Sequence, residues 1–90
     1  MTLHTGHEIL HRARAGRYGV GAFNTDNLEI TLAIIEAAEE TRSPVMLAIT
    51  AGALKYTRDR IAPIALAEAR NASVPVAVHL DHGDSFERCL

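Results

Sequence analysis

The residues best suited to chemistry stand at the end of a short apolar run, where His79, Asp81 and His82 follow the segment VPVAV at 74–78. An imidazole can bind zinc and a carboxylate can accept or donate a proton, so this stretch could hold a metal ion, catalyse proton transfer, or do both. Alternate side chains of a strand share a face, which places His79 and Asp81 together and turns Leu80 away.

Taken alone, this cluster leaves two interpretations open. His79 also fits a hydrogen-bonded core histidine, and Asp81 with His82 also fits a capping acid followed by a surface imidazole at the turn that Gly83 permits. A catalytic zinc ion takes about three protein ligands and leaves a position open for substrate. A single strand end cannot supply all of these ligands.

A second pair of imidazoles, His7 and His11, has the spacing of a metal pair on a helix. No acid or third ligand accompanies the pair. A solvated helix surface is therefore the favoured interpretation.

The elements that must position these residues alternate between helix and strand. Thr5 and Glu8 have the spacing of a capping box, and Gly16 stands where a helix would end. Apolar periodicity and turn residues predict the other boundaries. We expect a helix at 6–15, a strand at 18–23, a helix at 28–42, a strand at 45–49, a loop or short turn at 50–59, a helix at 60–72 capped by Asp59, a strand at 74–80, and a last helix capped by Asp84 or Ser85.

This repeat of about thirty residues predicts a parallel sheet with crossover helices, either an open doubly wound sheet or a (β/α)8 barrel. The stretch GVGAFN has two glycines, but Asn24 stands where a dinucleotide-binding motif needs a third small residue, and the glycines lie within the strand. A barrel places its chemistry at the carboxyl ends of its strands. Asn24, Thr50 and the segment 79–82 each end a predicted strand, which favours the barrel.

The composition is that of a globular protein and excludes several classes of function. The chain has 90 residues, 48% of them hydrophobic, and a formal net charge of −2. It has no basic stripe that would indicate nucleic acid as a partner, and no apolar run long enough to span a membrane. Its beginning lacks the pattern of a secretory signal, and its single cysteine, Cys89, fits a reducing cytoplasm. We therefore expect a cytoplasmic protein.

The segment VPVAVHLDHGDSFERCL, residues 74–90, resembles the third strand and following turn of class II, metal-dependent fructose-bisphosphate and tagatose-bisphosphate aldolases. In that family His-Leu-Asp-His-Gly-x-Ser-Phe-Glu is a hallmark. Residues 16–50 resemble the family's first strand, Phe-Asn-x-x-Asn turn, helix and second strand, and residues 51–56 resemble the loop that follows. The resemblance implies an α/β fold in which residues 1–90 form about three βα units, the N-terminal portion of a single TIM-barrel domain.

The resemblance also implies a role for each candidate site residue. His82 matches a ligand of the catalytic zinc ion, and Asp81 matches the acid/base at the hydroxyl next to the bond that breaks. Asn24 and Thr50 match residues of the substrate pocket. Zinc polarises the ketose carbonyl and stabilises the enediolate, so Lys55 is not expected to form a Schiff base.

The implied reaction is the reversible cleavage of fructose 1,6-bisphosphate or tagatose 1,6-bisphosphate to dihydroxyacetone phosphate and glyceraldehyde 3-phosphate. The choice between the two ketoses stays open. A barrel takes about 200 residues or more, and the family's other zinc ligands and its phosphate-binding loop lie in later strands. We therefore expect an N-terminal segment that is inactive alone, from a homo-oligomeric (dimeric or tetrameric) parent. The alternative is a truncated, non-catalytic product that is inert or acts only through assembly.

Overall fold

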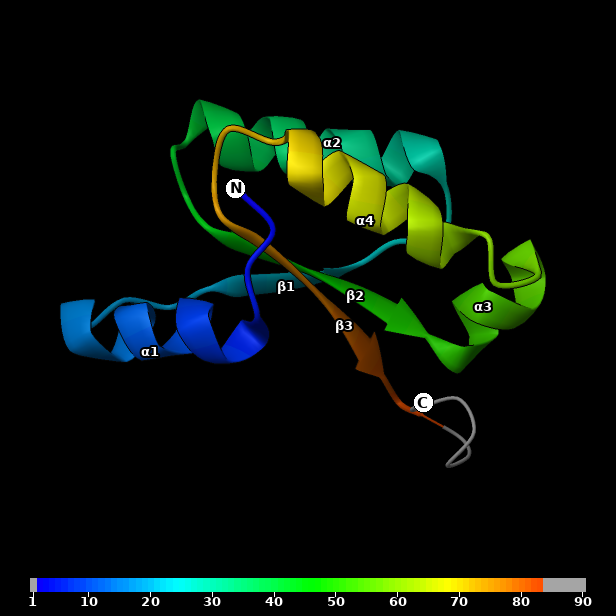
Figure 1. Cartoon of the computed structure of the whole chain (residues 1–90), viewed down its shortest axis with the longest axis horizontal. Coiled ribbons are helices and arrows are strands. Elements are labelled where there is room, and N and C mark those ends of the chain that lie inside the picture. The colour runs from blue at the N-terminus through cyan, green and yellow to red at the C-terminus, as the bar shows by residue number, and fades with distance from the viewer. Residues whose placement is uncertain (1, 84–90) are drawn as a thin grey trace.

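The computed structural model describes residues 2–83, which fold into a three-stranded parallel sheet with helices on both sides (Figure 1). The strands lie in the order β1-β2-β3, as the alternating pattern predicts. The elements along the chain are α1 (Gly6–Gly16), β1 (Gly21–Asn24), α2 (Leu28–Glu40), β2 (Val45–Thr50), α3 (Ala51–Thr57), α4 (Ile61–Asn71) and β3 (Val76–Asp81).

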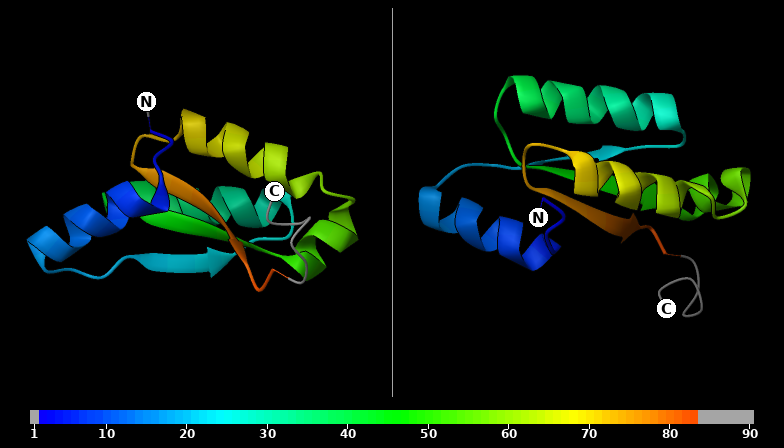
Figure 2. Two further views of the ribbon diagram at one scale, coloured as in Figure 1. Left: turned by 60° about the horizontal axis from the view of Figure 1, so that its bottom comes forward. Right: turned by 45° about the horizontal axis from the view of Figure 1, so that its top comes forward.

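The two faces of the sheet have different coverings (Figure 2). Helices α2 and α4 cover one face, where Leu47 and Val76 pack in the main core with Ile61 of α4. Helix α1 lies against the other face, where Ile9 contacts Met46 and Ala77. Because both crossover helices lie on the same face, the two β-α-β connections have the same hand.

The first segment of the chain extends the sheet, which the sequence did not predict. The amide of His4 donates to the Val76 carbonyl at 2.8 Å, and the Val76 amide donates to the Thr2 carbonyl at 2.9 Å. Leu3 thereby forms a parallel bridge with Val76. These residues cover the beginning of the outer edge of β3.

The region 50–59, expected to be a loop or short turn, instead contains the helix α3. The Thr50 hydroxyl accepts a hydrogen bond from the Ala53 amide at 3.0 Å, and Ala53 is buried in the main core. A side-chain cap and one buried face stabilise a helix that is too short to be stable alone.

The prediction that Asp59 caps α4 is wrong. The N-cap position is held by Arg60, whose side chain makes no capping bond, while Asp59 has φ 66°. The Thr57 hydroxyl accepts a hydrogen bond from the Ile61 amide at 3.2 Å and so satisfies the first amide of the helix. Pro63 lies in the first turn, where its missing amide costs little.

The strand and helix ends also shift by a few residues. The C-cap of helix α1 is Arg17, not Gly16, and Arg17 has the left-handed conformation. The Tyr18 amide then donates to the Ala13 carbonyl, and β1 begins only at Gly21. Strand β3 begins later than expected and includes Asp81. Predictions that concern Asp84, Ser85 and Cys89 lie outside the described residues. None of the helices within residues 2–83 combines the length and the apolar composition that a membrane span requires.

Candidate functional site

The candidate site lies at the carboxyl ends of the three strands. Asn24, Thr50 and Asp81 are the last residues of β1, β2 and β3, and parallel strands end at the same edge of a sheet. Thr50 and Asp81 are direct partners in the ladder, whereas Asn24 pairs with Ala48, two residues earlier on β2. The structure therefore brings the three predicted side chains to one end of the sheet.

The register also places these three residues on the same face. Paired residues of adjacent strands share a face, and so do alternate residues of one strand. Ala48 pairs with both Asn24 and His79, so His79 joins this face one row below Asp81. This face is the one opposite α2 and α4. Nearer the beginning of the strands, Met46 and Ala77 occupy the same face and pack against α1. The polar residues thus lie at the carboxyl ends of the strands, next to an apolar cluster.

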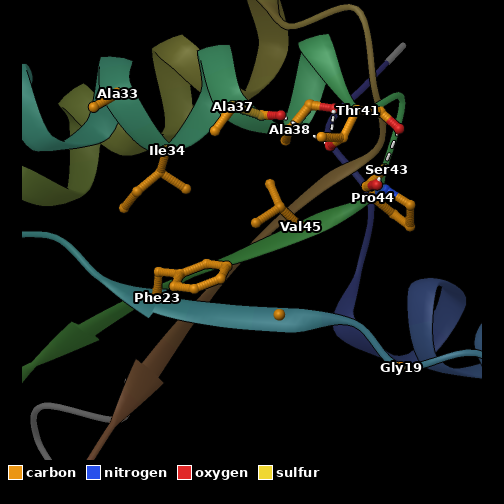
Figure 3. A pocket seen from close by; sticks show the side chains of 11 residues that line it. Gly19, Phe23, Ala33, Ile34, Ala37, Ala38, Thr41, Ser43, Pro44 and Val45 are labelled. Carbon is orange, nitrogen blue, oxygen red and sulfur yellow. Dashed lines mark hydrogen bonds between the residues drawn. The ribbon is translucent and has the colours of Figure 1, made fainter.

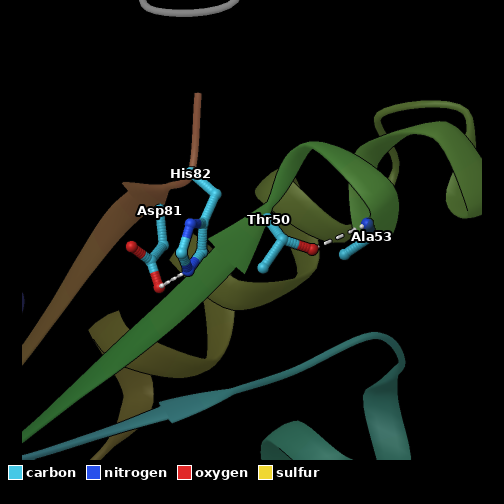
Figure 4. A network of polar contacts seen from close by, with 4 residues as sticks. All are labelled: Thr50, Ala53, Asp81 and His82. Carbon is cyan, nitrogen blue, oxygen red and sulfur yellow. Dashed lines mark hydrogen bonds and ion pairs between the residues drawn. The ribbon is translucent and has the colours of Figure 1, made fainter. Parts of the chain in front are cut away.

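His82 turns back toward Asp81 directly after the strand (Figure 4). Its Nε2 lies 3.6 Å from Oδ2 of Asp81, and the two side chains are 82% and 36% exposed. His82 has φ 53°, a left-handed conformation that is uncommon outside glycine. Gly83, which was expected to make this turn, has no positive φ. The strained position keeps an accessible imidazole beside a carboxylate, and such strain is common at functional sites.

Thr50 serves two purposes at its position. Its hydroxyl accepts the hydrogen bond from the Ala53 amide that caps α3. A hydroxyl has one donor and two acceptor sites, so the Thr50 side chain can still donate to a bound molecule.

The turn after β1 is held by two buried threonines that sequence reasoning did not single out. The hydroxyls of Thr25 and Thr31 lie 2.6 Å apart, and their oxygens lie 3.2 and 2.8 Å from the Asn27 carbonyl oxygen. Each hydroxyl has one proton, so one of them donates to the carbonyl and the other donates to its neighbouring hydroxyl. The Thr25 amide donates to the Ala48 carbonyl and continues the ladder past Asn24. A rigid turn therefore presents the exposed side chain of Asn24 at the site.

The donors present fit one part of a zinc site. The exposed imidazole of His82 is a suitable ligand, with Asp81 beside it. Residues 2–83 contain no group of three His, Cys, Asp or Glu side chains that could hold a metal ion. A catalytic zinc ion with about three protein ligands, His82 among them, would need at least one ligand from outside these residues.

An apolar groove of about 540 Å³ lies away from the candidate site, between β1 and α2 (Figure 3). Its walls include Phe23, which is 52% exposed, together with Ala33, Ile34 and Ala37 of α2. Phe23 points to the helix-covered face, opposite the face of Asn24, so the groove and the polar cluster are separate features.

Comparison with known proteins agrees with this arrangement. The family model described as fructose-bisphosphate aldolase class-II matches residues 4–90. The fructose-bisphosphate aldolase of Thermus caldophilus is 59% identical over 86 residues, which cover 96% of this chain and 28% of that protein. The fructose-bisphosphate aldolase of Geobacillus stearothermophilus is 47% identical over 93 residues, covering 99% of this chain and 32% of that protein.

The fold agrees as well. The crystal structure of the YdjI aldolase from Escherichia coli K12 superposes with a TM-score of 0.86 at 31% identity, over 94% of this chain and 34% of that one. The parallel sheet and its alternating helices thus match about a third of a solved aldolase structure. The chain belongs to the class II fructose-bisphosphate aldolase family, and it spans about a third or less of the length of the relatives it matches.

Proposed function

We propose that this chain is the first three βα units of a (β/α)8 barrel that acts as a zinc-dependent ketose-bisphosphate aldolase. The substrate class is a phosphorylated ketose, fructose 1,6-bisphosphate or tagatose 1,6-bisphosphate. One observation carries the proposal: Asn24, Thr50 and Asp81 share a face at the carboxyl ends of parallel strands, and His82 stands beside Asp81. Carboxyl ends of strands are where barrel enzymes place their catalytic residues.

Asp81 would act as the acid/base. In the cleavage direction its carboxylate takes the proton from the hydroxyl on the fourth carbon, the bond between the third and fourth carbons breaks toward the third, and an aldehyde leaves. In the condensation direction the same carboxyl returns the proton. The 36% exposure of Asp81 leaves it open to a bound substrate.

His82 would be one ligand of the catalytic metal. Zinc, when bound, polarises the ketose carbonyl. The exposed imidazole beside Asp81 supports this role, and the family match supports the choice of ion. Asn24 and Thr50 would orient the substrate through the Asn24 amide and the Thr50 hydroxyl.

The test is a chimera in which this chain replaces the matching 86-residue stretch of the Thermus caldophilus aldolase. We expect the chimera to bind zinc and to cleave fructose 1,6-bisphosphate, because the later strands supply the missing parts of the site. A folded, zinc-loaded chimera that cleaves neither ketose bisphosphate would contradict the proposal.

A His82→Ala variant of the chimera tests the metal role separately. Removing a ligand should lower zinc occupancy and activity together. Metal analysis of the purified variant checks the first effect and an aldolase assay the second. A matched His79→Ala variant, which removes the imidazole three residues earlier in β3, should keep its zinc.

A second candidate function is a non-catalytic one, in which the chain acts only by assembling with complementary barrel strands. The apolar groove beside β1 favours this second function, because another chain can pair with an open sheet edge and cover the exposed aromatic side chain next to it. Activity of the chimera would show that the sequence retains a competent site.

A further inference from the structure

Helix α1 carries two imidazoles that the aldolase site does not use. His7 and His11 lie one turn apart, and both side chains are exposed. Their rings are stacked, with centroids 6.1 Å apart and planes inclined by 23°. On the opposite side of the helix Ile9 and Ala13 are buried, with Ile9 packed on the sheet, so the backbone that holds the two rings is anchored.

The neighbouring polar side chains are engaged elsewhere. The Glu8 carboxylate accepts hydrogen bonds from the backbone amide and the hydroxyl of Thr5, at 3.3 and 3.1 Å. His4 is half-buried, and its Nδ1 lies 2.7 Å from the Thr2 carbonyl oxygen. No cluster of three potential ligands exists in the described part of the chain. A metal ion on α1 would therefore have two protein ligands and take water for the rest.

We propose that His7 and His11 form a bidentate site for a divalent transition-metal ion of the zinc type. The inference goes beyond the proposed aldolase function and does not depend on it. Imidazole nitrogens suit such ions, and two histidines four residues apart on one helix face can share one ion. Each ligating nitrogen lies about 2.1 Å from zinc. The rings must therefore close from their present separation, which free rotation of exposed side chains allows.

The consequence is a link between metal binding and folding. An ion bound by both histidines spans a full turn of α1 and binds only when that turn is helical. Binding to the folded state alone raises its stability. Zinc should therefore raise the urea midpoint of the 90-residue chain.

The test is a Zn²⁺ titration of the whole chain followed by the imidazole NMR signals. We expect the signals of His7 and His11 to shift together and to saturate in parallel, and the urea midpoint to rise. His7→Gln and His11→Gln should each weaken binding at least tenfold and abolish the rise in midpoint. His4→Gln and His82→Gln should leave the joint response of His7 and His11 unchanged.

A further variant tests whether zinc binding needs the four-residue spacing of the two histidines or only the presence of two histidines on α1. The double variant His11→Gln with Arg12→His keeps two imidazoles on α1 but places them on different sides of the helix. It should bind zinc as weakly as His11→Gln alone. The proposal is overturned if this double variant binds like the original chain, or if zinc leaves the His7 and His11 signals unmoved.

Discussion

His82 combines an accessible imidazole with a left-handed backbone at φ 53°. For residues other than glycine this conformation costs about 1–2 kcal/mol. His82→Gly should therefore raise the free energy of unfolding by up to about 1 kcal/mol, because relief of strain exceeds the entropy that glycine adds to the unfolded chain. Urea unfolding of the 90-residue chain measures the change, and His82→Val, whose side chain is branched at Cβ, should lower stability. A glycine variant less stable than the original would show that the conformation carries no strain.

Thr50 should contribute to stability as well as to the proposed site. Thr50→Val removes the hydroxyl that caps α3 and should cost about 1 kcal/mol of unfolding free energy. Thr50→Ser keeps the cap and should behave much like the original chain in urea unfolding. A loss in Thr50→Ser but not in Thr50→Val, which keeps the methyl group, would mean that the methyl group, not the hydroxyl, stabilises this position.

One carboxylate joins α2 to the turn before β3. The Ser73 amide and hydroxyl both donate to Glu39 at 2.8 Å, and these bonds hold the pKa of the Glu39 carboxyl below its ordinary value. Because the folded-state pKa is the lower one, the stabilisation is complete above the unfolded pKa of about 4.3 and is lost as the pH falls through the folded value.

Glu39→Gln should therefore lower stability at neutral pH, and the difference from the original chain should shrink with acidification below about pH 4. Urea midpoints measured across this range check the prediction. Glu40→Gln removes the same charge from α2, but the structure shows no bond between Glu40 and Ser73. This control should show no such pH-dependent difference, and identical pH profiles for the two variants would refute the assigned contact.

The sequence predicted the strand and helix order, because apolar periodicity and turn residues are local signals. It also predicted that Asn24, Thr50 and Asp81 would gather, because parallel strands end at one edge. Helix α3 escaped prediction because its stability depends on burying Ala53 in a distant core. The pairing of residues 2–4 with β3 escaped it for the same reason: both partners lie far apart in the chain.

The apolar groove beside β1 should make the isolated chain associate. Phe23 is exposed in the groove, on a strand with only β2 as a ladder partner among the described strands. Phe23→Lys should raise the monomer fraction in sedimentation experiments. Tyr56→Lys adds the same charge at an exposed aromatic outside the groove and should change it less. An equal rise in the monomer fraction for both variants would contradict a role of the groove in the association.

The isolated chain should also show no aldolase turnover. Residues 2–83 contain no group of three side chains that could hold a metal ion, and a catalytic zinc site needs about three. An aldolase assay of the purified chain with added zinc checks this. Turnover would mean that the 90-residue chain, alone or through self-association, completes the site.

We propose that Asp81 moves the proton and that His82 holds the metal, and an Asp81→Ala variant of the aldolase chimera separates these two roles. Two rates are compared, cleavage of fructose 1,6-bisphosphate and exchange of the carbon-bound proton of dihydroxyacetone phosphate with deuterium. We predict retained zinc, cleavage slowed by about 10²–10⁴-fold, and exchange slowed much less, since exchange does not involve the hydroxyl that Asp81 serves. Loss of zinc from Asp81→Ala, or an equal fall in both rates, would contradict the assignment.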